Sequence, residues 1–109
     1  MIQVTIFQDS SGGYKGFRMK GHAGYGEAGQ DIVCAAVSVL TLNTANAIEA
    51  FTEDSIEGKA DENAGMLEFR FCKEVSRESK LLIDTLVLGL KDIQSDYGKR
   101  YIKIRFEEV

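Results

Sequence analysis

The spacing of apolar residues switches repeatedly along this chain, between the two-residue period of a half-buried strand and the helical period of about 3.6 residues. Strand spacing occurs over residues 2–6, 14–20, 55–60, 66–72 and 102–106, and helical spacing over 32–51 and 74–97. The element order is therefore β-β-α-β-β-α-β. This order predicts an α/β fold of the α+β type, with two helices packed on one face of a mainly antiparallel sheet. The pattern leaves the strand order open.

Turn and capping residues indicate where these elements end. Asp9-Ser10-Ser11-Gly12-Gly13 and Asp61-Glu62-Asn63-Ala64-Gly65 are typical of hairpin loops. Asp31 is expected to cap the first helix, which then begins at Ile32, and Gly98 is expected to stop the second.

Each predicted helix has an apolar stripe that we expect to be buried. In the first helix the stripe is Val33, Val37, Leu40, Thr44, Ala47, Ile48 and Phe51. In the second it is Leu81, Leu82, Thr85, Leu86, Ile93 and Tyr97.

The size and composition are those of one ordinary globular domain. The 109 residues are 44% hydrophobic and 28% charged, so we expect a single domain over residues 1–109. The first seven residues lack the features of a secretory signal, and the uncharged runs are short or interrupted by polar groups. A cytoplasmic protein with no membrane association is expected.

Charge is distributed unevenly along the chain. The formal net charge is −4, and no lysine or arginine occurs from Gly21 to Gly58. The same stretch contains six acidic residues: Glu27, Asp31, Glu49, Glu53, Asp54 and Glu57. Phosphate binding depends on Lys and Arg, so we expect no direct nucleic-acid binding and favour a basic peptide as partner.

A glycine-rich segment leads directly to a cysteine in the first turn of the first helix. Residues 21–30 contain Gly21, Gly24, Gly26 and Gly29, which is typical of a loop that bends or moves. The helix amino terminus is expected to lower the pKa of Cys34, and a thiolate is the attacking form of cysteine. If the loop folds back, the only histidine, His22, becomes the acid and base partner of Cys34.

Other residues of this region have more than one interpretation. Asp31 either caps the helix or orients His22, and a carboxylate near Cys34 opposes thiolate formation. Ser38 lies one turn beyond Cys34 and either bonds the carbonyl four residues back or supports the thiol. Tyr25 either lines the site or is an exposed loop residue. Taken alone, Cys34 and His22 also fit a buried thiol and a structural histidine.

Metal and cofactor sites are disfavoured. One histidine and two cysteines lack the paired spacing of structural zinc ligands. The glycines at 24, 26 and 29 match G-x-G-x-x-G, but they lie in an acidic stretch outside a βαβ unit. We therefore expect no metal and no cofactor.

The run G-H-A-G-Y-G-E-A-G-Q-D-I-V-C-A-A-V-S, residues 21–38, resembles the signature of the ribosomal-processing cysteine protease family, Prp. The resemblance implies that His22 and Cys34 are the catalytic pair, and it places Asp31 and Ser38 at the family's aspartate and serine. It also implies a homodimer and a glycine loop that moves to admit a peptide. Ala28 departs from the pattern, since some members have an aromatic residue there.

The resemblance further implies a substrate. Members of this family remove a short N-terminal extension from the large-subunit ribosomal protein called L twenty-seven. Two other hypotheses remain open: a non-catalytic ribosome-associated binding module with a structural Cys34, and a thiol redox sensor that pairs Cys34 with Cys72. The latter requires the two Cβ atoms to lie within about 4.5 Å.

Overall fold

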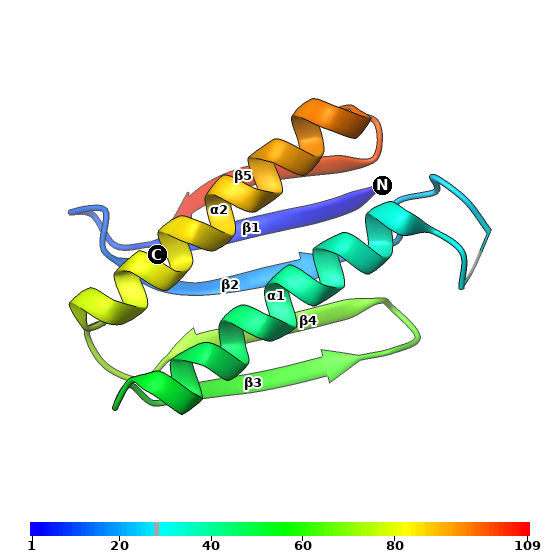
Figure 1. Ribbon diagram of the computed structural model, residues 1–109. Coiled ribbons are helices and arrows are strands. Elements are labelled where there is room, and N and C mark those ends of the chain that lie inside the picture. Colours follow the sequence, from blue (N-terminus) through cyan, green and yellow to red (C-terminus); the bar gives the residue numbers. More distant parts are fainter. Residues whose placement is uncertain (28) are drawn as a thin grey trace.

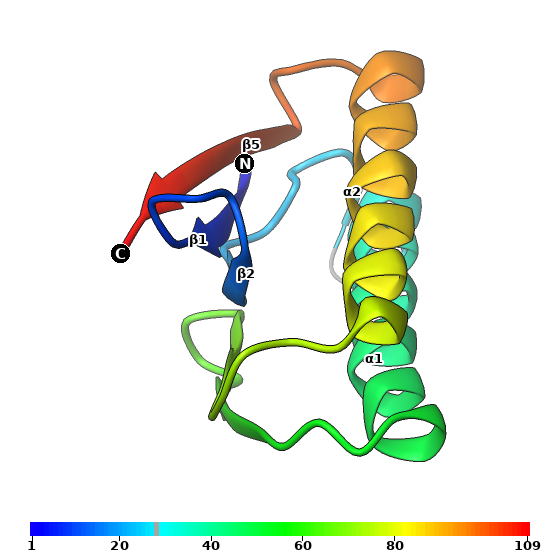
Figure 2. The same cartoon turned by 90° about the vertical axis from the view of Figure 1, so that its left-hand side faces the viewer.

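The computed structural model describes residues 1–27 and 29–109, and there it has two helices on one face of a five-stranded sheet (Figure 1). Turned by a quarter, the molecule shows the helical layer on one side and the sheet on the other (Figure 2). The strands are β1 (Ile2–Gln8), β2 (Tyr14–Lys20), β3 (Ile56–Asp61), β4 (Met66–Phe71) and β5 (Ile102–Glu108), and the helices are α1 (Ile32–Phe51) and α2 (Arg77–Tyr97). The predicted order is confirmed.

The strand order in the sheet is β3-β4-β2-β1-β5. The β1–β2, β2–β4 and β3–β4 pairs are antiparallel, whereas β1 and β5 are parallel. The sheet is therefore mixed and mainly antiparallel, as predicted. The parallel pair follows from the connection, because α2 carries the chain from one end of the sheet back to the other before β5 begins.

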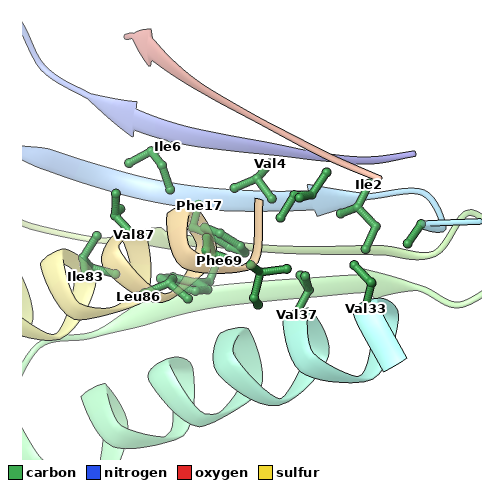
Figure 3. Close-up of a cluster of buried hydrophobic side chains, with 14 of the residues drawn as sticks. Ile2, Val4, Ile6, Phe17, Val33, Val37, Phe69, Ile83, Leu86 and Val87 are labelled. Carbon is green, nitrogen blue, oxygen red and sulfur yellow. The ribbon is translucent and has the colours of Figure 1, made fainter. Parts of the chain in front are cut away.

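The core lies between the helices and the inner face of the sheet (Figure 3). Ile2, Val4 and Ile6 of β1 are buried. The stacked rings of Phe17 and Phe69, with centroids 5.6 Å apart, extend this surface over β2 and β4. Burying one side chain of this size contributes about 1.5–3 kcal/mol, so the inner sheet face is a main source of stability.

Helix boundaries agree with the predictions at α1 and differ at α2. Asp31 caps α1, which begins at Ile32. Helix α2 begins at Arg77 instead of residue 74, because Ser76 is its cap and accepts a hydrogen bond from the Ser79 N–H. Gly98 caps its carboxyl end as predicted.

The buried stripes differ in part from the prediction. Phe51 is 78% exposed and Leu81 is 65% exposed. The buried residues are Val33, Val37, Thr41, Thr44 and Ile48 in α1, and Ser79, Ile83, Leu86, Val87, Leu90 and Ile93 in α2. The prediction was wrong because both helices are apolar on two sides. We call the exposed set Ile32, Val39, Leu42, Leu81 and Leu88 the outer helical face.

Helix α1 is also long and apolar enough to cross a membrane by length and composition alone, so the sequence argument from short uncharged runs was too strict. The core helix of a globular protein passes the same test. One side of α1 packs against the sheet, which accounts for part of its apolar character.

The carboxylate of Asp54 connects the segment after α1 to the start of α2. It accepts hydrogen bonds from the N–H and hydroxyl of Ser76, at 3.1 and 2.6 Å, and from the hydroxyl of Ser79. These hydrogen bonds, with that of the Ser76 hydroxyl the largest, lower the pKa of Asp54 against a smaller opposing effect of burial. Asp54 therefore helps to determine where α2 begins.

Asp54→Asn should lower the free energy of unfolding by about 1–2 kcal/mol at pH 7, because it replaces charge-assisted hydrogen bonds with weaker ones. The lowered pKa of Asp54 makes its contribution complete above about pH 4 and lost at more acidic pH. Urea unfolding measured from pH 7 to pH 3 should thus show a smaller acid-induced decrease in the free energy of unfolding for the variant than for the wild type. Glu53→Gln, at an exposed neighbour, is the control; an equal effect there would contradict the role of Asp54.

Candidate active site

The glycine loop, residues 21–30, joins the end of β2 to the start of α1. Gly21 begins it with φ of +100°, and a Cβ there would lie 2.6 Å from the carbonyl oxygen of Met1. Only glycine fits this close approach. Gly24 and Gly29 also have positive φ values, of 72° and 83°. The loop therefore turns sharply enough to return towards the first turn of α1. Ala28 lies outside the described residues.

Both oxygens of the Asp31 carboxylate are used. Oδ1 accepts the N–H groups of Val33 and Cys34, each at 3.0 Å, and caps α1. Oδ2 accepts the N–H groups of Tyr25 and Gly26, at 2.9 and 3.3 Å, and holds the glycine loop. One side chain thus joins the loop to the helix.

The cap interpretation of Asp31 is confirmed. No hydrogen bond or ion pair joins Asp31 to His22 in the described part of the chain. Burial raises the pKa of Asp31, but hydrogen bonds from the N–H groups of Cys34, Tyr25 and Gly26 lower it by more, so the pKa lies below its ordinary value. The carboxylate is accordingly charged at neutral pH.

Cys34 is half-buried in the first turn of α1, with its Sγ accepting the N–H of Ala23 at 3.1 Å. Burial raises the pKa of the thiol, and the Asp31 charge raises it further, against the lowering by the Ala23 N–H. The sequence prediction of a lowered pKa was wrong, because burial of the thiol and the nearby Asp31 carboxylate together raise the pKa. A base is therefore needed to form the thiolate.

His22 and Cys34 line the same pocket, of about 150 Å³. The His22 ring lies against Gly65, where a Cβ would come within 3.0 Å of Nε2. The contacts of the described residues include no hydrogen bond between the imidazole and the thiol. The fold thus brings the two predicted groups to one pocket, with His22 exposed to solvent.

The β3–β4 hairpin forms the other wall of the pocket. The sequence pattern predicted the hairpin but not its place beside His22 and Cys34. Besides the loop and α1, the pocket is lined by Ile2, Met19, Ala60, Asp61, Glu62, Gly65, Met66 and Leu67. Gly65 has φ of +61°, and its carbonyl accepts the Gly21 N–H at 3.1 Å. The turn residues predicted the hairpin, but only the β2–β4 register places it beside His22.

Tyr25 and Ser38 occupy different surroundings. Tyr25 makes edge-to-face contacts with Tyr97 and Tyr101, at centroid distances of 5.3 and 5.0 Å. It anchors the glycine loop against the carboxyl end of α2. Ser38 lines the same pocket as Cys34, and its predicted bond to the Cys34 carbonyl is absent from the contacts described for this region.

Cys72 lies far from the pocket. It follows the end of β4, whereas Met66 at the start of that strand lines the pocket with Cys34. Six residues of strand span about 20 Å, and both cysteines are free. The redox-sensor hypothesis is therefore wrong for this structure. Within residues 1–27 and 29–109, no three His, Cys, Asp or Glu side chains are grouped as metal ligands.

The chain is similar to known proteins in sequence and in structure. A family model described as Cysteine protease Prp matches residues 1–103. Ribosomal processing cysteine protease Prp of Staphylococcus aureus is 32% identical over 99 residues, covering 91% of this chain and 93% of that protein. The protein of the same name from Bacillus subtilis is 33% identical over 101 residues, covering 89% and 90%.

A solved structure is also similar. The essential ribosomal processing protease Prp from S. aureus, in complex with a covalently linked product peptide, has a TM-score of 0.92 and 31% identity. The match covers 98% of this chain and 100% of that one.

Gly65→Ala should displace the His22 ring, because the added Cβ would contact the imidazole and the backbone is strained at positive φ. His22 is the only histidine, so its imidazole gives a single set of NMR signals. We expect these signals to shift, and Cys34 alkylation by iodoacetamide to change with them. Gly12→Ala, with φ of +86° and nothing within 4 Å of the added Cβ, is the control for strain. Identical imidazole spectra for Gly65→Ala and wild type would contradict the contact.

Proposed function

This chain belongs to the Prp family of cysteine proteases, and on that premise we propose that residues 1–109 act as one protease domain that processes a ribosomal protein. The proposed substrate is the N-terminal extension of the large-subunit ribosomal protein called L twenty-seven. Cys34 is the nucleophile and His22 the general acid and base. The protein acts in the cytoplasm and uses no metal or cofactor.

The observation that carries this proposal is the shared pocket. Cys34 and His22 come from different elements and line one cavity, open to solvent beside His22. The similar S. aureus protease, whose structure holds a covalently linked product peptide, supports a covalent mechanism for this chain. A merely structural thiol has no need of a glycine loop that brings an exposed imidazole to it.

The reaction begins with removal of the thiol proton by His22, which the raised pKa of Cys34 makes necessary. The sulfur then attacks the scissile carbonyl carbon. The C–N bond breaks as His22 returns the proton to the leaving amine, and a thioester remains. His22 next takes a proton from water, the hydroxide attacks the thioester, and the thiol is restored when the acid product leaves.

The oxyanion that forms in the attack on the scissile carbonyl, and again in the hydrolysis of the thioester, needs a hydrogen-bond donor. The Cys34 N–H, a candidate from its position at the helix start, donates to Asp31. The Ala23 N–H lies 3.1 Å from the attacking sulfur, within reach of an oxygen on the carbon bonded to that sulfur. We assign the donor role to Ala23. When substrate binds, its carbonyl oxygen would replace the thiol sulfur as the acceptor of the hydrogen bond from the Ala23 N–H.

A basic substrate fits the charge around the pocket. The glycine loop and α1 have no lysine or arginine, and Asp61 and Glu62 line the hairpin wall. Opposite charge favours encounter with a basic ribosomal protein. Met19, Met66 and Leu67 provide an apolar floor for an uncharged side chain next to the scissile bond.

We also propose that the chain forms a homodimer through the outer helical face. Val39 is 64% exposed and Leu88 is 62% exposed, and they extend from the two helices on the side opposite the sheet. Exposed apolar surface of this extent on neighbouring helices is typical of a protein interface. The active-site pocket lies at the end of this layer, so both pockets stay accessible in such a dimer.

Cys34→Ala should abolish cleavage of the extended ribosomal protein, and His22→Ala should slow it by about 100- to 10,000-fold. Mass spectrometry of the products locates the cut and gives the rate. Cys72→Ala, which removes the other thiol, should cleave at the wild-type rate. Undiminished cleavage by Cys34→Ala would leave the non-catalytic binding module as the better hypothesis.

Leu42→Glu and Leu88→Glu should each weaken dimer formation by at least about 100-fold, since a buried unpaired carboxylate costs several kcal/mol. Light scattering across a dilution series measures the mass. Lys99→Glu, an exposed charge change outside this face, is the control. A monomeric wild-type protein at all concentrations would refute the dimer.

A further inference from the structure

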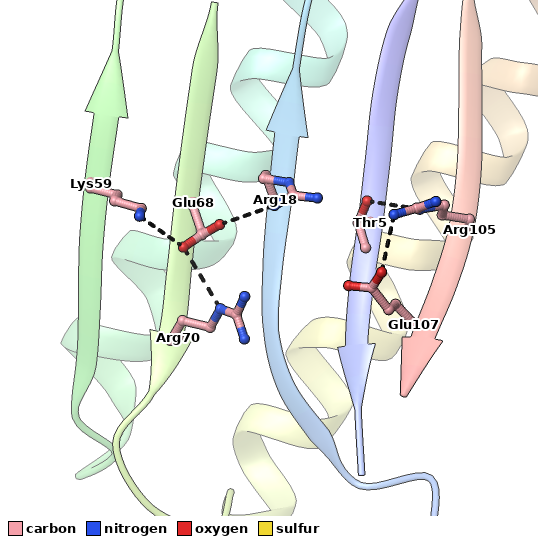
Figure 4. Close-up of polar contacts among 7 residues, drawn as sticks. All are labelled: Thr5, Arg18, Lys59, Glu68, Arg70, Arg105 and Glu107. Carbon is pink, nitrogen blue, oxygen red and sulfur yellow. Dashed lines mark hydrogen bonds and ion pairs between the residues drawn. The ribbon is translucent and has the colours of Figure 1, made fainter. Parts of the chain in front are cut away.

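Lysine and arginine gather on the open face of the sheet, the side opposite the helices (Figure 4). Alternation along the strands places six cations there: Arg18, Lys20, Lys59, Arg70, Lys103 and Arg105. Their strands pack side by side, so residues distant in sequence form one surface. The cation-free stretch of residues 21–58 indicated no nucleic-acid binding, and the local sequence pattern did not predict this face.

The register aligns these cations in rows. In the strand register, Lys59 is opposite Glu68, Glu68 opposite Arg18, Arg18 opposite Thr5, and Thr5 opposite Arg105. This row crosses the whole sheet, about 19 Å at the usual spacing between strands. The adjacent row has Lys20 and Lys103 on either side of Gln3. The cations therefore form an extended track and not a single cluster.

A nearly buried carboxylate holds part of this track in place. Glu68 is 8% exposed and lies 3.7 Å from Arg18, 3.6 Å from Lys59 and 3.7 Å from Arg70. One carboxylate cannot neutralise three cations, so positive charge remains. The Arg70 guanidinium also stacks on the buried Phe7 ring at 3.7 Å, which fixes its position. These side chains are ordered before any ligand binds.

The remaining carboxylates of this face lie towards its margins. Glu57 and Glu107 share a row with Arg70, and Asp61 is at the β3 end of the row that contains Lys20 and Lys103. Glu107 forms an ion pair with Arg105 at 3.1 Å. A hollow of about 360 Å³ occupies the middle, and four cations line it: Arg18, Lys20, Lys59 and Arg105. Glu68 is the single carboxylate among its lining residues. The centre of the face is thus strongly positive although the chain is acidic.

We propose that the open face of the sheet binds the phosphate backbone of single-stranded RNA. A track of point charges across a sheet matches a chain that presents one negative charge per nucleotide. The aromatic residue that β1 places on this face, Phe7, is 1% exposed beneath Arg70 and is not available for base stacking. Binding is therefore independent of base sequence. The site adjoins the protease pocket, with which it shares Met66, and the proposal departs from the expectation of no nucleic-acid binding.

Other anionic partners fit this face less well. A membrane-binding surface presents exposed apolar side chains, whereas Met66 is the single apolar residue among the polar and charged side chains that line this hollow. An acidic peptide usually gains affinity from backbone pairing at a free sheet edge, whereas the cations lie on the face of the paired strands. The repeated rows favour a polymer with regularly spaced charge.

The test is fluorescence anisotropy of a labelled 12-nucleotide uridine RNA with the purified protein, between about 50 and 300 mM KCl. Contact with three to four cations predicts that log K falls against log salt with a slope of about −2 to −3. Arg18→Gln with Arg105→Gln should weaken binding at least tenfold and make the slope shallower by about 1.4. Lys20→Gln with Lys103→Gln, which breaks no ion pair, should have a similar effect and exclude misfolding as the cause.

Lys91→Gln with Lys99→Gln removes the same charge elsewhere and should leave RNA affinity unchanged. Peptide cleavage should stay at the wild-type rate in every variant, so that failure of RNA binding and failure of the protease assignment are separate results. No salt-dependent binding, or equal loss in the Lys91 and Lys99 variant, overturns the proposal. Tighter binding to polyglutamate or to phosphatidylserine vesicles than to RNA overturns it in favour of those partners.

Discussion

The carboxylate of Asp31 is the constraint on which the rest of the pocket depends. It receives four backbone N–H groups, two from the first turn of α1 and two from the glycine loop. It ties the loop to the helix, and together with the hydrogen bond from the Ala23 N–H to Cys34 Sγ it keeps His22 near Cys34. The same charge raises the pKa of the thiol. One carboxylate therefore orders the loop and, together with burial, raises the pKa of the thiol.

The helical face and the open sheet face differ in charge, although the net charge of the chain is only −4. The helices expose aliphatic side chains, the loop and α1 lack cations, and the open sheet face gathers six of them. A basic peptide and a polyanion can therefore approach the same small domain on different sides. Lys20 ends β2 and His22 follows two residues later, so the positive track reaches the margin of the catalytic pocket.

The sequence predicted correctly those features that depend on residues close to one another along the chain. The element order, the Asp31 cap and the Gly98 stop follow from periodicity and capping, which act over a few residues. The hairpin wall of the pocket, the Tyr25 contacts and the cationic face depend on strand register and helix packing. Those relations join residues far apart in sequence. The pKa of Cys34 was predicted in the wrong direction because it depends on how deeply the folded chain buries the thiol and how close it brings the Asp31 carboxylate.

The parallel pairing of β1 with β5 has a consequence for biosynthesis. Thr5 and Arg105 are hydrogen-bonded across a separation of 100 residues. Until the last strand leaves the ribosomal tunnel, β1 lacks one neighbour and the core residue Ile102 is missing. Long-range closure of this kind is slow and late. The sheet and core therefore stay incomplete until β5 has been synthesised, and the pocket residue Ile2 lacks its partner Ile102 until then.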